Sequence, residues 1–465
     1  MIRRYRAPIE DGRILCDPPW DALPDLVLRS HASSFAKPDH RRELIEAAQA
    51  YHRERGELLP ESDPASPLLM GGHQPELFHA GVWAKNFALA GLAKRVRGTV
   101  VNLVVDQDLL KSATLKLPTL GAPNRPDLVS LQTLAFDEAG PTLPYELRRI
   151  QDFRHFASFP HHVLKQTHDW PFAPMLPDLW SGIAADDAPT IGERFAAMRR
   201  RVERCWGVAN LELPVSRLAT LTSFAEFVAA IEDRLSEFRA IYNASLQAYR
   251  KRHRLRSKDH PAPELAPGER PFWRIAPTGR ERPMRSYPAH ELRPRALTLT
   301  LYVRRMLADF FLHGLGGGLY DEVTDDIARR FFDRELPPYG VFTLTSRLPL
   351  SGYPTTPADL RAAVRHERDK IWNPQRFFPP FAPERQAFDE MLRADQSTKR
   401  ARRDRFRRLR DIKGMLRPAA DDVGMARLRV EVQANALLHR RESAWVLYPE
   451  AFLQPRLTAW IGDGE

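Results

Sequence analysis

A glycine-rich turn between two short apolar segments is the feature that most constrains the fold of this chain. Residues 68–70 are apolar, residues 71–75 read Gly-Gly-His-Gln-Pro, and residues 100–105 read Val-Val-Asn-Leu-Val-Val. Residues 82–95, between them, have the composition of a helix. A near-continuous apolar run is typical of a parallel strand that is covered on both faces. The stretch therefore predicts a strand, a turn, a helix and a parallel strand of an α/β sheet.

Polar residues follow the second apolar segment and mark a candidate site. Asp106, Gln107 and Asp108 come directly after it, at the carboxyl end of the predicted sheet, which is where open α/β sheets bind ligands. If the strand continued through them, the two carboxylates would share one face, whereas a turn would part them. Both are candidates for orienting a substrate amine or accepting its proton.

The glycine turn itself suggests an anion site. Glycines let the backbone approach a ligand closely, and the helix that follows offers free N–H groups to an anion. Gly72, His73 and Gln74 are therefore candidate contacts for a phosphate or a nucleotide. The pattern is neither the G-x-G-x-x-G fingerprint nor a P-loop. The alternative is an ordinary strand-to-helix turn, in which His73 and Gln74 bond only to nearby backbone.

A second glycine cluster lies in the region 292–350. Leu-Arg-Pro at 292–294 begins a predicted helix, and four glycines then occupy the five positions 314–318. A new helix is expected from Tyr320 to about residue 332. A plain corner between two helices would need only one glycine, so we expect the cluster to line a binding site, with the corner as the alternative. Both glycine turns are expected to converge on one pocket above the carboxylates.

A basic segment in the last third of the chain bears on possible partners. From 399 to 413, nine of fifteen residues are Lys or Arg, within two charged helical segments that are expected to be interrupted near Pro418. Such a helix could bind RNA, but it could also be the solvated face of a coiled-coil arm that forms a homodimer. The formal net charge of +11 permits a nucleic acid or anionic substrate without requiring one.

Composition excludes several other classes. The two cysteines, Cys16 and Cys205, have no metal or disulfide spacing, and the histidines in 153–178 lack a metal-binding pattern. No apolar run approaches the length of a membrane span, and no leader follows the basic first residues. We therefore expect a soluble cytoplasmic protein with no metal and no membrane partner.

The order of these landmarks resembles that of one family, the bacillithiol biosynthesis cysteine-adding enzymes. The family's G-Q-Q-P-G-like turn is matched by residues 72–77, and its Asp-His-Asp-like triplet by 106–108. Its L-R-P helix and its Gly-Gly and aromatic turn are matched by 292–294 and 316–320, and its Pro-Pro strand by 337–341. The chain departs from the family at His73, Glu76 and Gln107, where the family has Gln, Gly and His, and its arm is shorter.

This resemblance implies a fold and a domain organisation. The fold would be a Rossmann-like parallel-sheet core similar to class I aminoacyl-tRNA synthetases and nucleotidyltransferases, with a helical coiled-coil arm. The domains are expected as an N-terminal wrapping arm (1–65), a core (66–355) with an inserted helical connector (217–290), the arm (356–442) and a C-terminal return onto the core (443–465).

The resemblance also implies an activity. The chain would be a ligase that joins the carboxyl of cysteine, or of a similar amino acid, to the amine of a small acceptor such as glucosaminyl-malate. Amide formation in water requires an activated carboxylate, and ATP or another nucleotide is the expected activator. A non-catalytic nucleotide-binding scaffold and an RNA-binding factor are the alternatives. The predicted catalytic residues are Asp106, Asp108 and His73, and the predicted binding residues are Gly72, Gln74, Gly316, Gly317, Gly318, Tyr320 and Arg293.

Overall fold

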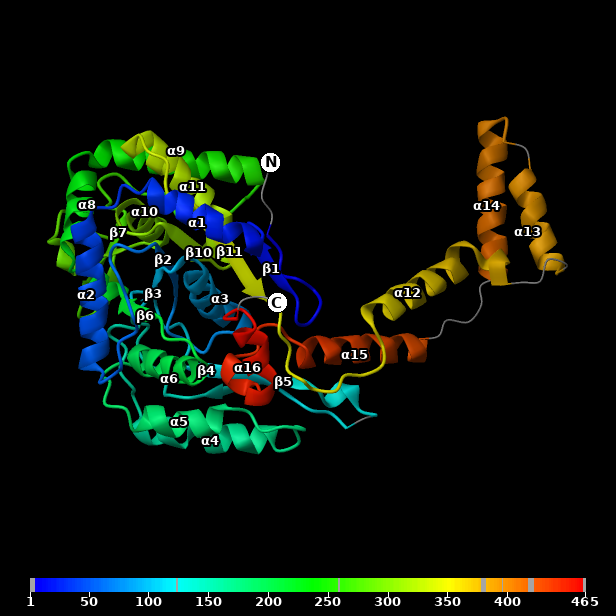
Figure 1. Cartoon of the computed structure of the whole chain (residues 1–465). Helices are drawn as coiled ribbons and strands as arrows, with labels where there is room; N and C mark the ends of the chain where they lie inside the picture. Colours follow the sequence, from blue (N-terminus) through cyan, green and yellow to red (C-terminus); the bar gives the residue numbers. More distant parts are fainter. Residues whose placement is uncertain are drawn as a thin grey trace. The chain divides into compact units, whose positions relative to one another are not determined.

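Figure 1 shows the computed structural model of the chain. The structure describes residues 5–122, 124–257, 260–377, 382–394, 396–416 and 422–462. The chain forms two compact units: unit 1 consists of Met1–Leu117, Thr133–Pro349 and Arg441–Glu465, and unit 2 of Pro118–Gln132 and Leu350–Arg440.

Unit 1 is built on a six-stranded, mostly parallel sheet of order β1-β11-β10-β2-β3-β6. Strands β11, β10, β2, β3 and β6 are parallel, and β1 pairs antiparallel with β11. From β2, the chain adds β3 and β6 on one side, then crosses back to add β10 and β11 on the other. The direction of winding therefore reverses between β2 and β10, and the predicted α/β class is confirmed. The strands are β1 (Ile14–Asp17), β2 (Leu68–His73), β3 (Thr99–Val104), β6 (Leu211–Pro214), β10 (Phe310–His313) and β11 (Tyr339–Leu344).

The stretch that opened the sequence analysis forms β2, α3 (Ala80–Val96) and β3, with β3 in the interior of the sheet as predicted. The prediction of a turn at Gly71 and Gly72 is wrong, because both lie within β2. A Cβ at Gly71 would lie 2.8 Å from Leu89 Cδ1 of α3, and one at Gly72 would lie 3.2 Å from Leu103 Cβ of β3. These glycines therefore serve close helix and strand packing.

The sheet is covered on both faces, which explains its apolar strands. Met70, Val101 and Val341 point into one core cluster with α2 (Pro38–Glu54) and with helices α8 to α11. Gly71 points to the other face, where α3 lies. Figure 1 shows α2 and α3 on opposite sides of β2 and β3.

The second glycine cluster lies inside a helix. The predicted helix from residue 292 is wrong beyond Met306: α10 (Ala296–Met306) ends there, and residues 310–313 form the central strand β10. Gly314 is the N-cap of α11 (Leu315–Phe332), and the other three glycines belong to the first turn of this helix and not to a loop. A Cβ at Gly317 would lie 2.4 Å from His313 Nδ1, and one at Gly318 would lie 2.1 Å from Val341 Cγ2. The cluster thus lets α11 start against β10 and β11.

Between β6 and β10, the apolar period of residues 223–253 predicts one long helix with a capping box at Ser223. The structure forms two helices over these residues, because the chain turns at Asp233 and Arg234. Ser223 Oγ bonds to Tyr302 Oη at 2.7 Å and does not cap the helix. The pattern of residues 272–285 predicts a hairpin, and these residues form β7 and β8 of a small sheet of order β8-β7-β9. These elements are α7 (Val215–Leu218), α8 (Thr222–Glu232), α9 (Leu235–His253), β7 (Phe272–Ala276), β8 (Gly279–Glu281), η3 (Ala289–Glu291) and β9 (Leu292–Pro294).

The first residues differ from the expected wrapping arm, because they contribute to the core. β1 extends the sheet, and Leu44, Ile45 and Ala48 of α2 belong to the main apolar cluster. The pattern of residues 191–205 predicts a helix, and these residues form α6 (Ile191–Cys205). The other elements are η1 (Trp20–Ala22), α1 (Leu23–Ala32), β4 (Thr114–Thr119), β5 (Ser130–Ala135), α4 (Phe153–Thr167), α5 (Leu176–Ala184), η5 (Trp445–Leu447) and α16 (Glu450–Thr458).

Unit 2 is mostly helical. Thr356 begins α12 through a capping box with Asp359. Helix α12 packs against α15, and α13 against α14. The interruption predicted near Pro418 lies outside the described residues. The elements are η2 (Pro126–Leu128), α12 (Pro357–Trp372), η4 (Pro374–Phe377), α13 (Pro383–Arg393), α14 (Lys399–Leu416) and α15 (Asp422–Leu438). No helix in the part of the chain that the structure describes is long and apolar enough to cross a membrane.

A buried ion network joins α6 to β6 and to the end of α2. Arg199 Nη1 donates to Glu203 at 2.8 Å, and Arg199 also bonds to Glu212. Arg200 Nη1 donates to Glu212 Oε2 at 2.5 Å, and Arg200 Nε to Glu57 at 3.0 Å. Because each charge meets an opposite charge, these five side chains can remain ionised inside the fold.

Candidate functional site

The candidate site lies at the carboxyl ends of β2, β3 and β10, where the winding of the sheet reverses. In open α/β sheets such a reversal leaves a crevice between the two strands at which it occurs. β2 ends at His73, and β10 ends at His313, directly before α11. The two glycine clusters singled out in the sequence therefore lie within β2 and directly after β10, which are adjacent strands.

Asp108 is the most accessible of the predicted site carboxylates. Gln74 Nε2 donates to its Oδ2 at 2.8 Å, and Arg280 Nη1 donates to its Oδ1 at 2.9 Å. The Arg280 guanidinium lies 4.1 Å from the ring centre of Trp273, which holds it in place. The Asp108 side chain remains 39% exposed. It is thus oriented by two neighbours and still open to a ligand.

Three further groups surround Asp108. Burial, and then Asp108 among other charges, raises the pKa of Glu76. Tyr145 Oη donates to Glu76 at 3.5 Å. Burial followed by repulsion from Asp321 and Asp108 raises the pKa of Tyr320, the residue that follows the second glycine cluster. The structure therefore joins Gln74 to Asp108 by a hydrogen bond and places Tyr320 where the charge of Asp108 acts on it.

Asp106 lies apart from Asp108, because β3 ends at Val104 and the chain turns. Ser216 donates to Asp106 through its backbone N–H at 2.9 Å and through its hydroxyl at 2.5 Å. Burial, and secondly repulsion from Glu146, raises the pKa of Asp106 to about 7. Asp106 lines a cavity of about 120 Å³ together with Tyr145, Glu146 and other residues. Ser216 thus holds Asp106 at the start of α7, and Asp106 shares no hydrogen-bond partner with Asp108 among the bonds of the described side chains.

Arg293 is occupied by Glu146. Its Nε donates to Glu146 at 3.2 Å and its Nη2 at 2.9 Å, while Nη1 donates to two backbone carbonyls. This pairing fixes the Glu146 carboxylate beside Asp106. Arg293 therefore contributes to the predicted site by holding Glu146, which lines the same cavity as Asp106.

His73 lies inside the fold. Its Nδ1 meets the Gln74 carbonyl oxygen at 3.1 Å, and its Nε2 meets Asn86 Nδ2 at 3.3 Å. Burial, and then the charges of Arg199 and Lys85, lower its pKa well below the usual value. The ring is thus neutral, and both nitrogens have partners within the chain. This geometry is that of the alternative interpretation, in which His73 bonds to nearby backbone.

A positive region lies beside the start of α3 and was missed in the sequence. Lys85 is buried, and Lys85 Nζ donates to the Gly72 carbonyl at 2.9 Å. Burial lowers its pKa to about 8. Arg441 bonds to Thr343, Thr345 and the Leu344 carbonyl. Neither cation forms an ion pair with a carboxylate of the described residues.

One signal could have pointed to this region. Lys85 is a lone charge in the apolar segment Trp-Ala-Lys-Asn-Phe at 83–87, and a buried lysine is rare unless it has a function or a partner. Arg441 carries no such signal, since it lies more than three hundred residues away in the chain. Arg441 lies against the first turn of α3, since a Cβ at Gly81 would be 2.8 Å from Arg441 Nη2. Positive charge is therefore concentrated at this end of the helix.

Glycines 316–318 do not form an open loop that could contact a ligand. They lie in the first turn of α11, where Gly317 and Gly318 pack against His313 and Val341. No group of three or more His, Cys, Asp and Glu side chains in the described segments is arranged to hold a metal ion. No protein-family model matches this sequence, and a search of curated proteins found no match. The functional argument therefore rests on the geometry of the site.

The stability of the site should depend on pH through His79, the residue that caps α3. His79 Nδ1 accepts from Gly81 N–H at 3.1 Å. Burial, and then Arg441 and Lys85, lower its pKa from 6.5 to about 4. His79 binds a proton more readily in the unfolded chain than in the folded chain. The contribution of neutral His79 to the free energy of unfolding is therefore complete above pH 6.5 and is lost as the pH falls toward 4. The loss should reach at most about 3 kcal/mol.

Urea unfolding of the wild type and of His79→Asn at several pH values checks this expectation. Asparagine can still cap the helix, but it does not titrate. The free energy of unfolding of the variant should therefore depend less steeply on pH between pH 4 and 6.5 than that of the wild type. His161→Asn, at an exposed position on α4, is the control and should keep the slope. Equal slopes for the wild type and His79→Asn would contradict the assignment.

Proposed function

We propose that this protein is an amide-forming ligase with a Rossmann-like core, which joins an amino acid, cysteine or a similar one, to the amine of a small acceptor. The observation that carries the proposal is the Asp108 cluster at the reversal of the sheet, next to a separate cationic region. A reaction between an amine and a carboxyl group needs two such subsites. The strand order supports the Rossmann-like assignment, since the parallel strands read third, second, first, fourth and fifth.

The Asp108 cluster suits the amine. An ammonium group would be attracted by Asp108 and Glu76, and it must lose a proton before it can attack a carboxyl carbon. The raised pKa makes Glu76 a stronger proton acceptor than an ordinary carboxylate. Gln74 and Arg280 hold Asp108 in one orientation, so Asp108 would position the amine while Glu76 accepts the proton.

The cationic region suits an activated carboxylate. Lys85, Arg441 and the N–H groups at the start of α3 present positive charge without a carboxylate partner in the described chain. A nucleotide, when bound, would supply the leaving group that makes amide formation favourable. Its phosphates would be held by Lys85 and by the helix start. The Gly72 carbonyl keeps the Lys85 ammonium at this place.

The proposal is tested by incubating the purified protein with ATP, an amino acid and an amine acceptor, and by measuring the amide product by mass spectrometry. Cysteine with glucosaminyl-malate is the first pair, and reactions that lack the acceptor or the nucleotide are the controls. We expect product only in the complete mixture. The same measurement of thiols in cells with and without the gene identifies the natural product.

Two outcomes would replace the proposal. Nucleotide binding without product for any of a panel of amino acids and amines would favour a non-catalytic scaffold. RNA binding whose affinity falls steeply with salt, together with no product, would favour an RNA-binding factor that uses the basic helix α14.

A further inference from the structure

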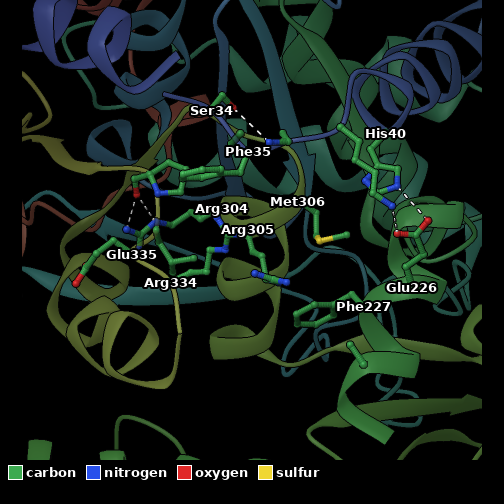
Figure 2. Close-up of a pocket in the computed structure, with 16 residues that line it drawn as sticks. Ser34, Phe35, His40, Glu226, Phe227, Arg304, Arg305, Met306, Arg334 and Glu335 are labelled. Atoms are coloured by element: carbon green, nitrogen blue, oxygen red, sulfur yellow. Dashed lines mark hydrogen bonds and ion pairs between the residues drawn. The ribbon is translucent and has the colours of Figure 1, made fainter. Parts of the chain in front are cut away.

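A second cavity in unit 1 lies at the opposite end of the parallel strands from the Asp108 cluster. It has a volume of about 310 Å³, and its wall includes Ala308, which precedes β10, and Pro337, which precedes β11. Its other sides come from the segment between α1 and α2, from α8 and from the end of α10. Figure 2 shows the lining side chains. A volume of this size is that of a small-molecule site.

Two arginines of this cavity lack an acidic partner. Arg305, at the end of α10, and Arg334, after α11, form no ion pair or hydrogen bond with any described residue. Arg305 lies 4.0 Å from the ring centre of Phe332, and Arg334 lies 4.6 Å from that of Phe35. The aromatic rings hold both guanidinium groups while their N–H donors stay unused.

The other charges of the cavity are already paired. Lys37 Nζ donates to Glu226 at 2.8 Å, and His40 contacts the same carboxylate at 3.3 Å. Arg304 pairs with Asp321 and Asp325, both at 2.8 Å. Glu335 lies 3.8 Å from Arg329. Arg305 and Arg334 therefore leave two positive charges of the lining uncompensated.

The two arginines also disfavour each other. Burial, and then repulsion from Arg334, lowers the pKa of Arg305. Arg305 lies in the last turn of α10 and Arg334 follows the C-cap of α11, and cations near the carboxyl end of a helix interact favourably with the helix dipole. That interaction accounts for positive charge near the helix ends, but it leaves the N–H donors of both guanidinium groups unused. An anion between them would satisfy those donors and remove the repulsion.

We propose that this cavity binds a small phosphorylated molecule, whose phosphate lies between Arg305 and Arg334. A phosphate carries close to two negative charges and offers three acceptor oxygens, which matches two guanidinium groups on separate elements. The apolar part of the molecule would lie against Phe227 and Met306, which line the same cavity. The site is separate from the proposed ligase site and does not depend on that function.

Binding of inorganic phosphate to the full chain tests the proposal. Thermal unfolding is followed in phosphate, in acetate and in chloride of equal ionic strength, and the dissociation constant is taken from the dependence on concentration. The wild type should be stabilised by phosphate more than by the other two anions. Arg305→Met and Arg334→Met keep an unbranched apolar side chain but remove the guanidinium group, and each should weaken phosphate binding by at least about tenfold.

Arg256→Met is the matched control, since it removes the same charge from an exposed loop after α9; it should bind phosphate like the wild type. Arg441→Met, which removes a cation from the region proposed for the nucleotide phosphates, should also keep this binding, which separates the two phosphate sites. Equal stabilisation by acetate and phosphate would overturn the ligand class. Phosphate binding that survives in the double variant Arg305→Met/Arg334→Met, or no binding by the wild type, would overturn the site.

A second readout distinguishes binding from a purely structural role. In phosphate-free buffer, Arg305→Met should be as stable as the wild type or more stable, because the variant removes a repulsion. A loss of stability without phosphate, combined with unchanged phosphate binding, would assign Arg305 to the helix end alone and would overturn the proposal.

Discussion

Replacing Glu212 by glutamine is expected to lower the free energy of unfolding by about 3–5 kcal/mol, the cost of removing one partner from a buried ion network. Glu212 is fully enclosed between Arg199 and Arg200 and bonds to both. Burial alone would raise its pKa, but the two guanidinium groups outweigh burial and lower it. The variant would leave both arginines with too little negative charge, and urea unfolding at neutral pH measures the loss.

Glu54→Gln is the matched control, because Glu54 also bonds to an arginine, Arg217, but its side chain is 51% exposed. A surface ion pair contributes at most about 1 kcal/mol, so the control should be close to the wild type. Similar losses in Glu212→Gln and Glu54→Gln would mean that burial does not set the importance of the network. A stable Glu212→Gln would mean that the arginines find other partners.

The strands of the sheet could largely be predicted from the sequence, and the reason is burial on both faces. Residues 100–104 belong to the interior strand β3, and residues 211–214 form β6 at the edge of the sheet; every side chain of both segments is buried. Local sequence determines such strands well, because every side chain must be buried. The helix α6 was predicted at its observed bounds for the same reason, since its apolar period is complete.

Strand β10 could not be predicted, because its sequence continues the helical pattern before it. Phe310 follows Met306 at a helical spacing, and nothing in the segment Phe-Phe-Leu-His excludes a helix. Only the pairing of β10 with β2 and β11 makes it a strand, and this is tertiary information. The glycines of α11 were misplaced for a related reason. Their lack of a side chain lets α11 pack closely against β10 and β11. A sequence does not show which neighbouring element lies against a glycine.

The candidate site divides in the same way. Asp108 and Gln74 were found from their position after apolar segments, and they do bond to each other. Arg280 and Arg441 could not be found, since they reach the site from distant segments without a motif. Asp106 and His73 were singled out by the same positional argument as Asp108. The turn after β3 and the packing of α3 enclose them instead, and these details depend on the fold.

We expect the largest loss of activity from a substitution of Asp108. If the proposed ligase function holds, Asp108→Asn should lower kcat/KM for amide formation by about a hundredfold or more, the scale of a lost proton-transfer or orienting group. The amide keeps the shape of the side chain and can still bond to Gln74, but it cannot attract an ammonium group. Because the side chain is 39% exposed and its ion pair with Arg280 is screened, unfolding should change by less than about 1 kcal/mol.

The measurement combines product formation over a range of acceptor concentrations with thermal unfolding. Asp21→Asn is the control: this carboxylate is 93% exposed and lies 3.7 Å from Arg95, so the loss of its charge should alter neither activity nor stability. Asp108→Glu should retain part of the activity, because it keeps the charge. An Asp108→Asn protein with wild-type activity would remove Asp108 from the site. A protein that loses activity only together with stability would assign Asp108 to the fold, as the partner of Arg280 that holds the hairpin β7–β8 against the carboxyl end of the sheet.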